Sequence, residues 1–305
     1  MIIVDRLEKS YNGFQAVDGI SFEVESGQIL GFLGPNGAGK TTTMKILTCF
    51  MPPTKGTVTV DGLSVTEHSK EIRKKIGYFP EHTPIYADMN VVDYLQFVCE
   101  VRGIEKSQQM AAIKRVIEIT SLGDMLQKDI GELSKGYRQR VGLAQAMVHN
   151  PDILILDEPT TGLDPNQIVE IRSLIKEIGK EKTVIFSTHI LQEVTATCDN
   201  VMIINKGSIV AKGTPDELMA NSQGKGVLNI ELNEGASDVV EKISALNGVT
   251  KAKAGKEANS FVIESDKNTD IRETVFKAAV KNKWVLLGMN YHQTSLEDVF
   301  RQLTD

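Results

Sequence analysis

The sequence lacks any apolar run long enough to cross a bilayer, which leaves a membrane role only through a partner. Its beginning, Met1 to Asp5, has neither the basic start nor the apolar core of a signal peptide. The three cysteines, Cys49, Cys99 and Cys198, are scattered, so neither a cysteine-held metal site nor a CxxC redox motif is predicted. Free thiols fit a reducing compartment better than a secreted protein, and we expect a cytoplasmic chain.

An excess of positive charge is also missing. The formal net charge is −6 at pH 7, which argues against non-specific binding to nucleic acid. The sequence contains no convincing internal repeat or low-complexity tract. The rest of the composition is ordinary for a globular protein, with 41% hydrophobic and 24% charged residues, and a length of 305 residues allows about two domains.

The chain does contain a glycine-rich loop with the pattern of a phosphate cradle. It follows an apolar run, 29–33, that predicts a buried strand, and it precedes residues 42–50, whose apolar spacing predicts a helix. Lys40 would contribute its charge to the β and γ phosphates of a nucleotide, and the Thr41 hydroxyl would ligate Mg²⁺. The alternative is a glycine-rich turn before an ordinary helix. The loop consists of Gly34, Pro35, Asn36, Gly37, Ala38, Gly39, Lys40, Thr41 and Thr42.

Two adjacent carboxylates follow another strongly apolar run. Residues 153–156 predict a central parallel strand that ends at Asp157 and Glu158. Ligands bind at the carboxyl ends of such strands, so these carboxylates should lie beside the phosphate loop. Asp157 would hold Mg²⁺, and Glu158 would take a proton from an attacking water. His189 follows the buried strand predicted at 183–187, so it also lies at the carboxyl end of a strand, as Asp157 and Glu158 do. A surface carboxylate pair and a loop histidine are the plainer alternatives.

Five further residues carry weaker signals. Tyr11 precedes a turn between two predicted strands and could stack on a base or only pack at a strand end. Glu81 follows a short strand ended by a proline and could equally be a solvated loop carboxylate. Ser134 suits the N-cap of a helix, and with Gly136 it could form either an anion site or a plain cap. Asp164 lies in a turn before a helix that a proline opens.

The order of the predicted elements indicates two domains. The first covers residues 1–220 and contains a helical insertion at about 85–150. A polar, glycine-containing linker at 221–226 precedes the second domain, 227–305. Its predicted elements run strand, helix, strand, strand, helix, strand, which is the order of the ferredoxin-like unit, and a last helix is predicted at 296–303. The second domain shows no catalytic constellation, so a regulatory or interface role is the default.

With these motifs in this order, the chain resembles the ATP-binding subunits of ABC transporters over about residues 1–220. The resemblance implies an α/β fold with a P-loop NTPase core and an inserted helical subdomain, to which this chain adds a small α+β ferredoxin-like domain. It also implies ATP and Mg²⁺ as cofactors. The motifs that carry it are Tyr11, the phosphate loop, Glu81, the signature Leu133–Tyr137, the Asp157-Glu158 strand, the Gly162-Leu163-Asp164 loop and His189.

The resemblance also assigns roles to these residues. Tyr11 would stack on adenine, Glu158 would be the general base, and His189 would contact the γ-phosphate. Ser134 and Gly136 would contact the γ-phosphate held by the opposite protomer. The partner in this head-to-tail dimer would be a second copy or a paralogous ATPase. Asp164 belongs to the same set of nucleotide-site motifs.

Two departures from the family pattern stand out. Glu81 occupies a position where the family usually has Gln, but a carboxylate is still a hard oxygen ligand for Mg²⁺. Lys135 interrupts the signature, which reads Leu-Ser-Lys-Gly-Tyr instead of Leu-Ser-Gly-Gly-Gln, and adds positive charge near a phosphate site.

Three further features resemble a narrower branch of the same family. They are the stretch 77–82, the added C-terminal domain and the ending 295–300. That branch includes gliding-motility-associated systems and exporters of drugs, polysaccharides or lipids.

The first functional hypothesis is therefore an ATPase that powers a separate membrane permease. Such a chain would lie on the inner face of the cell membrane through that permease and would not bind nucleic acid. A non-transport relative that acts on ribosomes or DNA is the second hypothesis. A small-molecule kinase is the third, although it shares only the phosphate loop.

Overall fold

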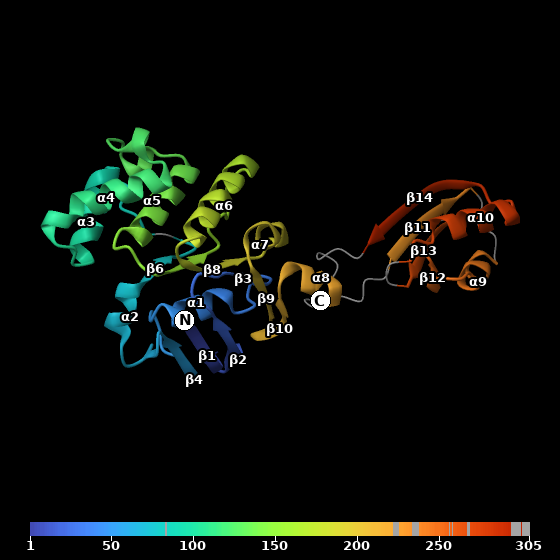
Figure 1. Ribbon diagram of the computed structural model, residues 1–305, viewed down its shortest axis with the longest axis horizontal. Coiled ribbons are helices and arrows are strands. Elements are labelled where there is room, and N and C mark those ends of the chain that lie inside the picture. The colour runs from blue at the N-terminus through green and yellow to red at the C-terminus, as the bar shows by residue number, and fades with distance from the viewer. Residues whose placement is uncertain are drawn as a thin grey trace. The chain divides into compact units, whose positions relative to one another are not determined.

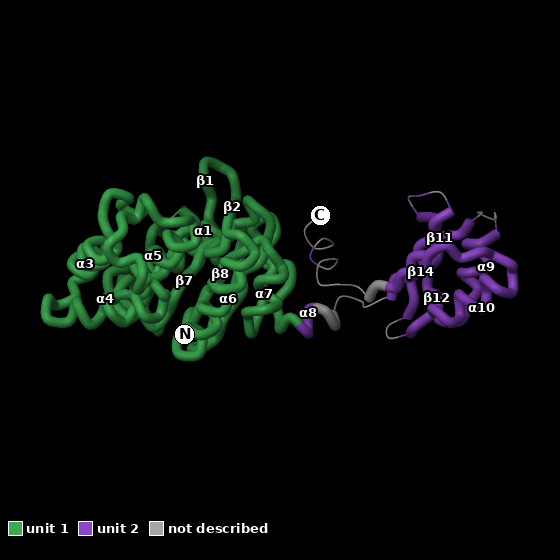
Figure 2. Tube along the Cα trace, turned by 90° about the horizontal axis from the view of Figure 1, so that it is seen from above, with its two compact units in different colours: residues 1–215, 304 green, residues 216–303, 305 purple. Residues whose placement is uncertain are grey.

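The computed structural model describes residues 1–82, 84–221, 226–233, 238–255, 257, 259–266, 269–293 and 300. The chain divides into two compact units, Met1–Pro215 and Asp216–Leu303, which Figure 2 shows in green and purple. Both units combine helices with sheets, in agreement with the predicted α/β class. Within the described ranges, no helix is both long and apolar enough to cross a membrane.

The first unit is built on a six-stranded sheet with the order β10-β9-β3-β8-β7-β6. Its strands are parallel except for β10, which pairs antiparallel with β9 at one edge. Every residue of β3, β7 and β8 is buried, which confirms the three buried strands predicted from apolar runs. In Figure 1, α5, α6 and α7 lie on one side of this sheet and α1 lies on the other. The strands are β3 (Ile29–Leu33), β6 (Ile76–Phe79), β7 (Ile153–Asp157), β8 (Thr183–Thr188), β9 (Asn200–Asn205) and β10 (Ser208–Gly213).

A smaller antiparallel sheet, with the order β2-β1-β4-β5, packs against the first. Its strands β1 and β2 form the predicted hairpin, which turns at Asn12 and Gly13 with φ angles of 47° and 88°. Two positive φ angles are what a two-residue hairpin turn of this kind requires, and asparagine and glycine tolerate them best. The main core lies between the two sheets and α1. The elements are β1 (Ile2–Tyr11), β2 (Phe14–Val24), β4 (Lys55–Val60), β5 (Leu63–Ser64) and α1 (Lys40–Leu47).

The stretch predicted as a helical insertion contains three α-helices and two short 3-10 helices, Gly123–Met125 and Ile130–Glu132. In α4, the buried residues Ala112, Ile113 and Val116 recur at helical spacing, and α3 presents a similar apolar stripe. These stripes face one another and α5, which gives the insertion a core of its own. The helices are α3 (Val91–Val101), α4 (Lys106–Thr120) and α5 (Lys135–Met147). The others in this unit are α2 (Ser69–Lys75), α6 (Pro165–Gly179) and α7 (Leu191–Thr197), and α8 (Pro215–Asn221) begins at its end.

Two side chains tie the end of α5 to β6. Gln145 Nε2 donates a hydrogen bond to the Tyr78 carbonyl oxygen at 3.2 Å, and His149 Nε2 lies 3.1 Å from the Ile76 carbonyl oxygen. A carbonyl oxygen only accepts, so His149 carries a proton on Nε2. Burial, with a smaller contribution from the Arg102 charge, lowers the pKa of His149 to about 4. The strand that leads toward Glu81 is therefore held by a neutral, half-buried histidine.

We expect His149 to make the fold sensitive to mild acid. It stays neutral when folded, whereas an unfolded histidine titrates near pH 6.5, so its stabilising contribution is complete above that pH and is lost as the pH falls toward 4. Between pH 7.5 and pH 5 this loss is about 2 kcal/mol of unfolding free energy. Urea unfolding followed by circular dichroism should show it in the wild type. His149→Gln should remove this part of the pH dependence, and a variant with wild-type dependence would contradict the assignment.

The second unit has an antiparallel sheet with the order β12-β13-β11-β14. Its elements follow one another in the predicted order, and its core includes the buried Leu228, Ile263 and Val275. The last described strand begins at Leu286. Except for residue 300, the helix predicted at 296–303 lies outside the described residues, as does most of the linker predicted at 221–226. The elements are β11 (Gly226–Leu232), α9 (Val239–Ser244), β12 (Val249–Ala254), β13 (Ser260–Ser265), α10 (Arg272–Asn282) and β14 (Leu286–Gln293).

Candidate active site

The parallel sheet brings three predicted segments to one edge. In the strand registers, Asp157 on β7 lies opposite Ser187 on β8, and Thr188 on β8 lies opposite Leu33 on β3. The phosphate loop starts directly after Leu33, and its first amide, Gly34 N, donates to the Thr188 carbonyl oxygen at 3.2 Å. The loop, the carboxylate pair and the strand end that carries His189 are therefore neighbours, as the rule for parallel strands predicts.

The phosphate loop leaves amide donors available at the start of α1. The helix begins at Lys40 and ends at Leu47, so the prediction of a start at Thr42 was two residues late. Gly39 precedes it with a φ of 107°, and a Cβ there would lie only 2.5 Å from the Ala16 carbonyl oxygen. Because glycine has no side chain to cap the helix, the first N–H groups remain free to bind an anion. This explains why the loop needs glycine at this position.

Lys40 and Glu158 form a buried ion pair at this loop. Lys40 Nζ lies 3.1 Å from Glu158 Oε1, and the two side chains are only 6% and 7% exposed. The same ammonium donates to the Gly34 carbonyl oxygen at 2.7 Å. A phosphate that binds the loop would therefore compete with Glu158 for the lysine.

Glu158 also binds the predicted histidine. Its Oε2 lies 2.9 Å from His189 Nδ1 and accepts a bond from the Thr161 hydroxyl at 3.3 Å. The Glu158 backbone has a φ of 51°, in the left-handed region, and its N–H donates to the Ser187 carbonyl oxygen at 3.1 Å. Such a conformation costs about 1–3 kcal/mol for a residue other than glycine, so the surrounding bonds must hold it. The turn directs the carboxylate toward both Lys40 and His189.

Asp157 is fully buried beside this group. The Ser187 hydroxyl donates to its Oδ1 at 2.5 Å, whereas its Oδ2 has no hydrogen-bond partner among the described residues. Burial is the largest influence and raises the pKa of Asp157, while the hydroxyls of Ser187 and Thr41 act in the opposite direction. A cation beside Oδ2 would stabilise the carboxylate and satisfy that oxygen. The site therefore fits a metal ion.

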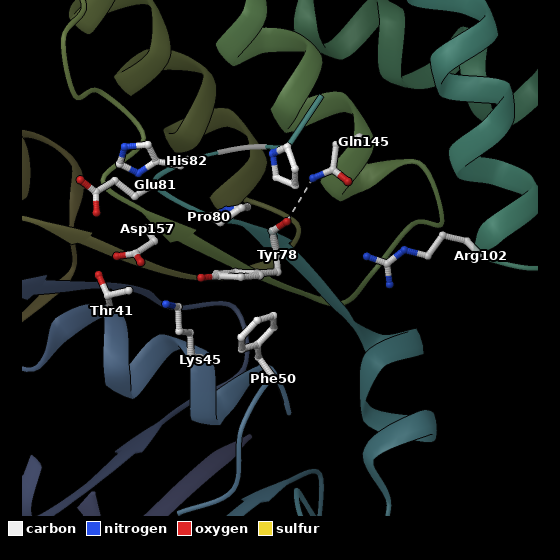
Figure 3. Close-up of a pocket in the computed structure, with 11 residues that line it drawn as sticks. Thr41, Lys45, Phe50, Tyr78, Pro80, Glu81, His82, Arg102, Gln145 and Asp157 are labelled. Atoms are coloured by element: carbon white, nitrogen blue, oxygen red, sulfur yellow. Dashed lines mark hydrogen bonds between the residues drawn. The ribbon is translucent and has the colours of Figure 1, made fainter. Parts of the chain in front are cut away.

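The three predicted metal ligands share one pocket of about 500 Å³. Thr41, Glu81 and Asp157 lie at the same end of it in Figure 3. In the part of the chain that the structure describes, no three His, Cys, Asp or Glu side chains gather to form a metal site alone. One hydroxyl with two carboxylates suits Mg²⁺, which keeps several waters and shares phosphate oxygens as ligands. The pocket is lined by Thr41, Lys45, Phe50, Tyr78, Pro80, Glu81, His82, Pro84, Arg102, Gln145 and Asp157.

Ser134, Gly136 and Asp164 form a second group. Ser134 caps α5 by accepting from Tyr137 N at 3.4 Å, and Asp164 caps α6 by accepting from the amides of Asn166 and Gln167, both at 3.0 Å. The backbone of Gly136 packs against the Gln167 side chain, where a Cβ would lie 2.9 Å from its Cδ. These side-chain bonds remain within the starts of α5 and α6. These contacts therefore join the three residues to the starts of α5 and α6. Among the described residues, the three make no hydrogen bond to the phosphate loop.

Tyr11 lies at the end of β1 and is 41% exposed. Its hydroxyl donates to Met51 Sδ at 3.0 Å, and Lys9 Nζ lies 5.5 Å from the centre of its ring. The hairpin thus holds an accessible aromatic face in place. Stacking of that face on a base stays a prediction.

The structure places in the site three residues that the sequence patterns did not single out. Ser187 binds both Asp157 Oδ1 and the Glu158 amide, and Tyr78 lines the pocket next to them. Ser187 could have been found, because it lies at the same strand end as His189. For Tyr78 the only sequence pattern that could have indicated the site is its place on the strand before Glu81, which is a weaker indication. No sequence pattern indicates Gln145, because only the packing of α5 against β6 brings it to the pocket.

Comparison with known proteins relates the chain to one family. A family model described as ABC transporter matches residues 17–161. The chain is 38% identical to the uncharacterised ABC transporter ATP-binding protein YxlF of Bacillus subtilis strain 168, over 73% of this chain and 74% of that protein. It is 33% identical to the Nod factor export ATP-binding protein I of Burkholderia orbicola strain AU 1054, over 98% of this chain and 95% of that one. The solved structure of cbiO1 from Clostridium perfringens, described as part of the ABC transporter complex cbiONQ, matches with a TM-score of 0.66 and 28% identity. That match covers 72% of this chain and 90% of cbiO1.

Proposed function

This chain belongs to the ABC transporter family of ATPases, and we propose that it hydrolyses Mg²⁺·ATP to power a separate membrane permease. The observation that carries the proposal is the group formed by Lys40, Glu158 and His189 at the end of the parallel strands. It combines a cation for phosphate, a carboxylate that can accept a proton and an imidazole that orients that carboxylate. These are the groups that phosphoryl transfer to water requires.

Binding of ATP would rearrange the Lys40–Glu158 pair. The loop amides and Lys40 would hold the β and γ phosphates, and Thr41, Asp157 and Glu81 would hold Mg²⁺. The ion supplies positive charge to the phosphate oxygens. Once Lys40 engages phosphate, Glu158 Oε1 is released from its ion pair and is free to accept a proton from water. His189 would keep the Glu158 carboxylate oriented toward the attacking water and could itself contact the γ-phosphate.

The separate group at α5 and α6 favours a composite site. Ser134 and Gly136 make no bond to their own phosphate loop, so we assign them to the γ-phosphate held by an opposite protomer. Two chains in head-to-tail order would then enclose two ATP molecules, and Tyr11 would stack on the adenine of its own site. The second chain would be another copy or a paralogous ATPase. Because each ATP would contact both chains, it would favour the closed dimer.

An open groove beside α2 and α3 supports a permease partner. It is hollowed to about 1070 Å³ and offers four cations, Lys70, Arg73, Lys74 and Arg102, with no carboxylate in its lining. Tyr86 and Phe97 add apolar surface and are 54% and 39% exposed. We assign this groove to an acidic, amphipathic segment of the permease, which would keep the chain on the inner face of the membrane. Full-length likeness to a Nod factor export protein supports export as the direction and the proposed exporter branch, which includes gliding-motility-associated systems.

Two measurements test the proposal together. Purified chain should release inorganic phosphate from ATP only with Mg²⁺, and the full chain should sediment with cell membranes that contain its permease.

The affinity of the double variant Lys70→Glu, Lys74→Glu for these membranes should fall at least tenfold, because the two new negative charges repel an acidic partner. Its affinity for ATP should stay unchanged. The matched control is Lys114→Glu with Lys180→Glu, two exposed lysines outside the groove. Transfer of phosphate to another acceptor, or sedimentation with ribosomes or DNA instead, would contradict the proposal.

A further inference from the structure

Two buried oxygen atoms in the pocket of Figure 3 have no hydrogen-bond partner among the described residues. They are Asp157 Oδ2 and the hydroxyl oxygen of Tyr78. Leaving such a group unsatisfied destabilises the folded protein, and native proteins keep few of them. The Asp157 oxygen is explained by the proposed metal ion. The Tyr78 hydroxyl is not used by anything described so far.

The sheet register places the two residues on the same face. Tyr78 on β6 lies opposite Ile155 on β7, and Asp157 follows Ile155 by two residues. Side chains alternate along a strand, so Tyr78, Ile155 and Asp157 all point to the face that α1 covers. Figure 3 shows the Tyr78 hydroxyl on the side of Thr41 and Asp157, with Lys45 below it. The Gln145 side chain holds the Tyr78 carbonyl and thereby fixes the strand.

The phenol keeps its proton in this position. Burial raises the pKa of Tyr78, and the charges of Asp157 and Glu81 raise it further. The hydroxyl can therefore both donate one hydrogen bond and accept others. A metal-bound water is a pure donor toward its surroundings and needs acceptors. Mg²⁺ keeps several waters when a protein supplies few ligands, and this pocket supplies one hydroxyl and two carboxylates.

We propose that the Tyr78 hydroxyl binds a water of the hydrated Mg²⁺ held by Thr41, Asp157 and Glu81, and so positions the ion. This inference rests on the metal site of the proposed function. Tyr78 is a positioning residue, since it acts through the water and not on the nucleotide. The ring itself packs on the core and needs no hydroxyl for that purpose. A phenylalanine would therefore fill the same space and lose only the link to the metal.

The test is Tyr78→Phe, with Tyr94→Phe as the matched control. Tyr94 lies on α3, is 4% exposed and is outside the lining of this pocket. Full-length protein is titrated with Mn²⁺ in the presence of ADP while free Mn²⁺ is followed by electron paramagnetic resonance. We expect the Mn²⁺ dissociation constant of Tyr78→Phe to rise about tenfold, as when groups that orient metal ligands are removed elsewhere. ADP affinity in EDTA and the melting temperature in EDTA should not fall, and the Tyr94→Phe control should bind Mn²⁺ as the wild type does.

Two results would overturn the inference. Wild-type Mn²⁺ affinity in Tyr78→Phe would show that the hydroxyl does not reach the hydrated ion. A melting temperature in EDTA that falls by several degrees would show that the hydroxyl serves the fold. If the wild type itself binds no Mn²⁺ with ADP, the metal site of the proposed function fails and the role of Tyr78 fails with it. Failure of Tyr78→Phe alone leaves that metal site intact.

Discussion

Replacing Glu158 with glutamine should lower the turnover of ATP by about 10²–10⁴-fold, the usual contribution of a general base. Glutamine keeps the size of the side chain and an oxygen that can face His189, but its amide cannot accept a proton from water. The Glu158 N–H donates to the carbonyl and hydroxyl oxygens of Ser187, and these bonds do not involve the Glu158 side chain, so they remain in the variant. The loss should therefore appear in kcat, measured as phosphate release at saturating Mg²⁺·ATP, and not in folding.

The same variant should bind ATP more tightly than the wild type does. In the structure, Glu158 Oε1 holds Lys40 Nζ at 3.1 Å in a buried pair, and a bound phosphate must displace it. Without the negative charge, Lys40 is available to phosphate at once. We expect the ATP dissociation constant in EDTA, measured by calorimetry, to fall about tenfold, which corresponds to about 1.4 kcal/mol.

The matched control is Glu177→Gln, an exposed carboxylate on α6 that pairs with Lys180. It should change neither turnover nor ATP affinity, since surface pairs of this kind contribute little. Turnover near the wild-type value in Glu158→Gln would remove Glu158 from the role of base. Weaker ATP binding would show that the carboxylate does not compete with phosphate.

The sequence alone predicted the centre of the site because local patterns determine it. Fully apolar runs at 29–33, 153–156 and 183–187 are typical of strands buried on both faces, and such strands are parallel. Once they are parallel, the residues that follow them must meet at one edge, whatever the strand order. The phosphate loop, Asp157, Glu158 and His189 could therefore be placed together without knowledge of which strands are neighbours.

The remaining contacts depend on register and packing, which no local pattern reveals. Ser187 binds Asp157 only because β7 pairs with β8 with these two residues opposite each other. Tyr78 enters the pocket because β6 lies beside β7 in a particular register. Asp164 shows a different difficulty. The family resemblance placed it among the nucleotide-site motifs, which stays a prediction, and the structure shows that it caps α6, a role that an aspartate before a helix-opening proline already indicates.

The division of the candidate residues into two groups has a direct consequence for the assembly. A single chain offers the loop group, with Lys40 and Glu158, and the cap group, with Ser134 and Gly136, but no described hydrogen bond links them. If each nucleotide needs both groups, two chains must supply them to each other. A head-to-tail pair with two-fold symmetry does so twice, with the same two surfaces used on both chains.

Two inactive variants should therefore restore activity when they are mixed. Ser134→Asp keeps a good helix cap, because aspartate caps as well as serine, but places a negative charge toward the γ-phosphate of the opposite chain. Glu158→Gln removes the base from its own loop group. A dimer with one chain of each kind contains one intact site, formed by the loop group of the Ser134→Asp chain and by Ser134 of the Glu158→Gln chain. With equal mixing before ATP is added, half of the dimers are mixed, and phosphate release should recover to about a quarter of the wild-type value.

The control mixture combines Glu158→Gln with Lys40→Ala. Both lesions lie in the loop group, so every site in a mixed dimer is broken and phosphate release should stay at the level of the separate variants. Recovery in this control would mean that the two changes do not act where the structure places them. Absence of recovery in the first mixture, while light scattering confirms mixed dimers, would show that each chain completes its own site. If phosphate release recovers in the first mixture and not in the control, Ser134 must contact the nucleotide of the opposite chain. No other arrangement leaves one site with both an intact loop group and an intact Ser134.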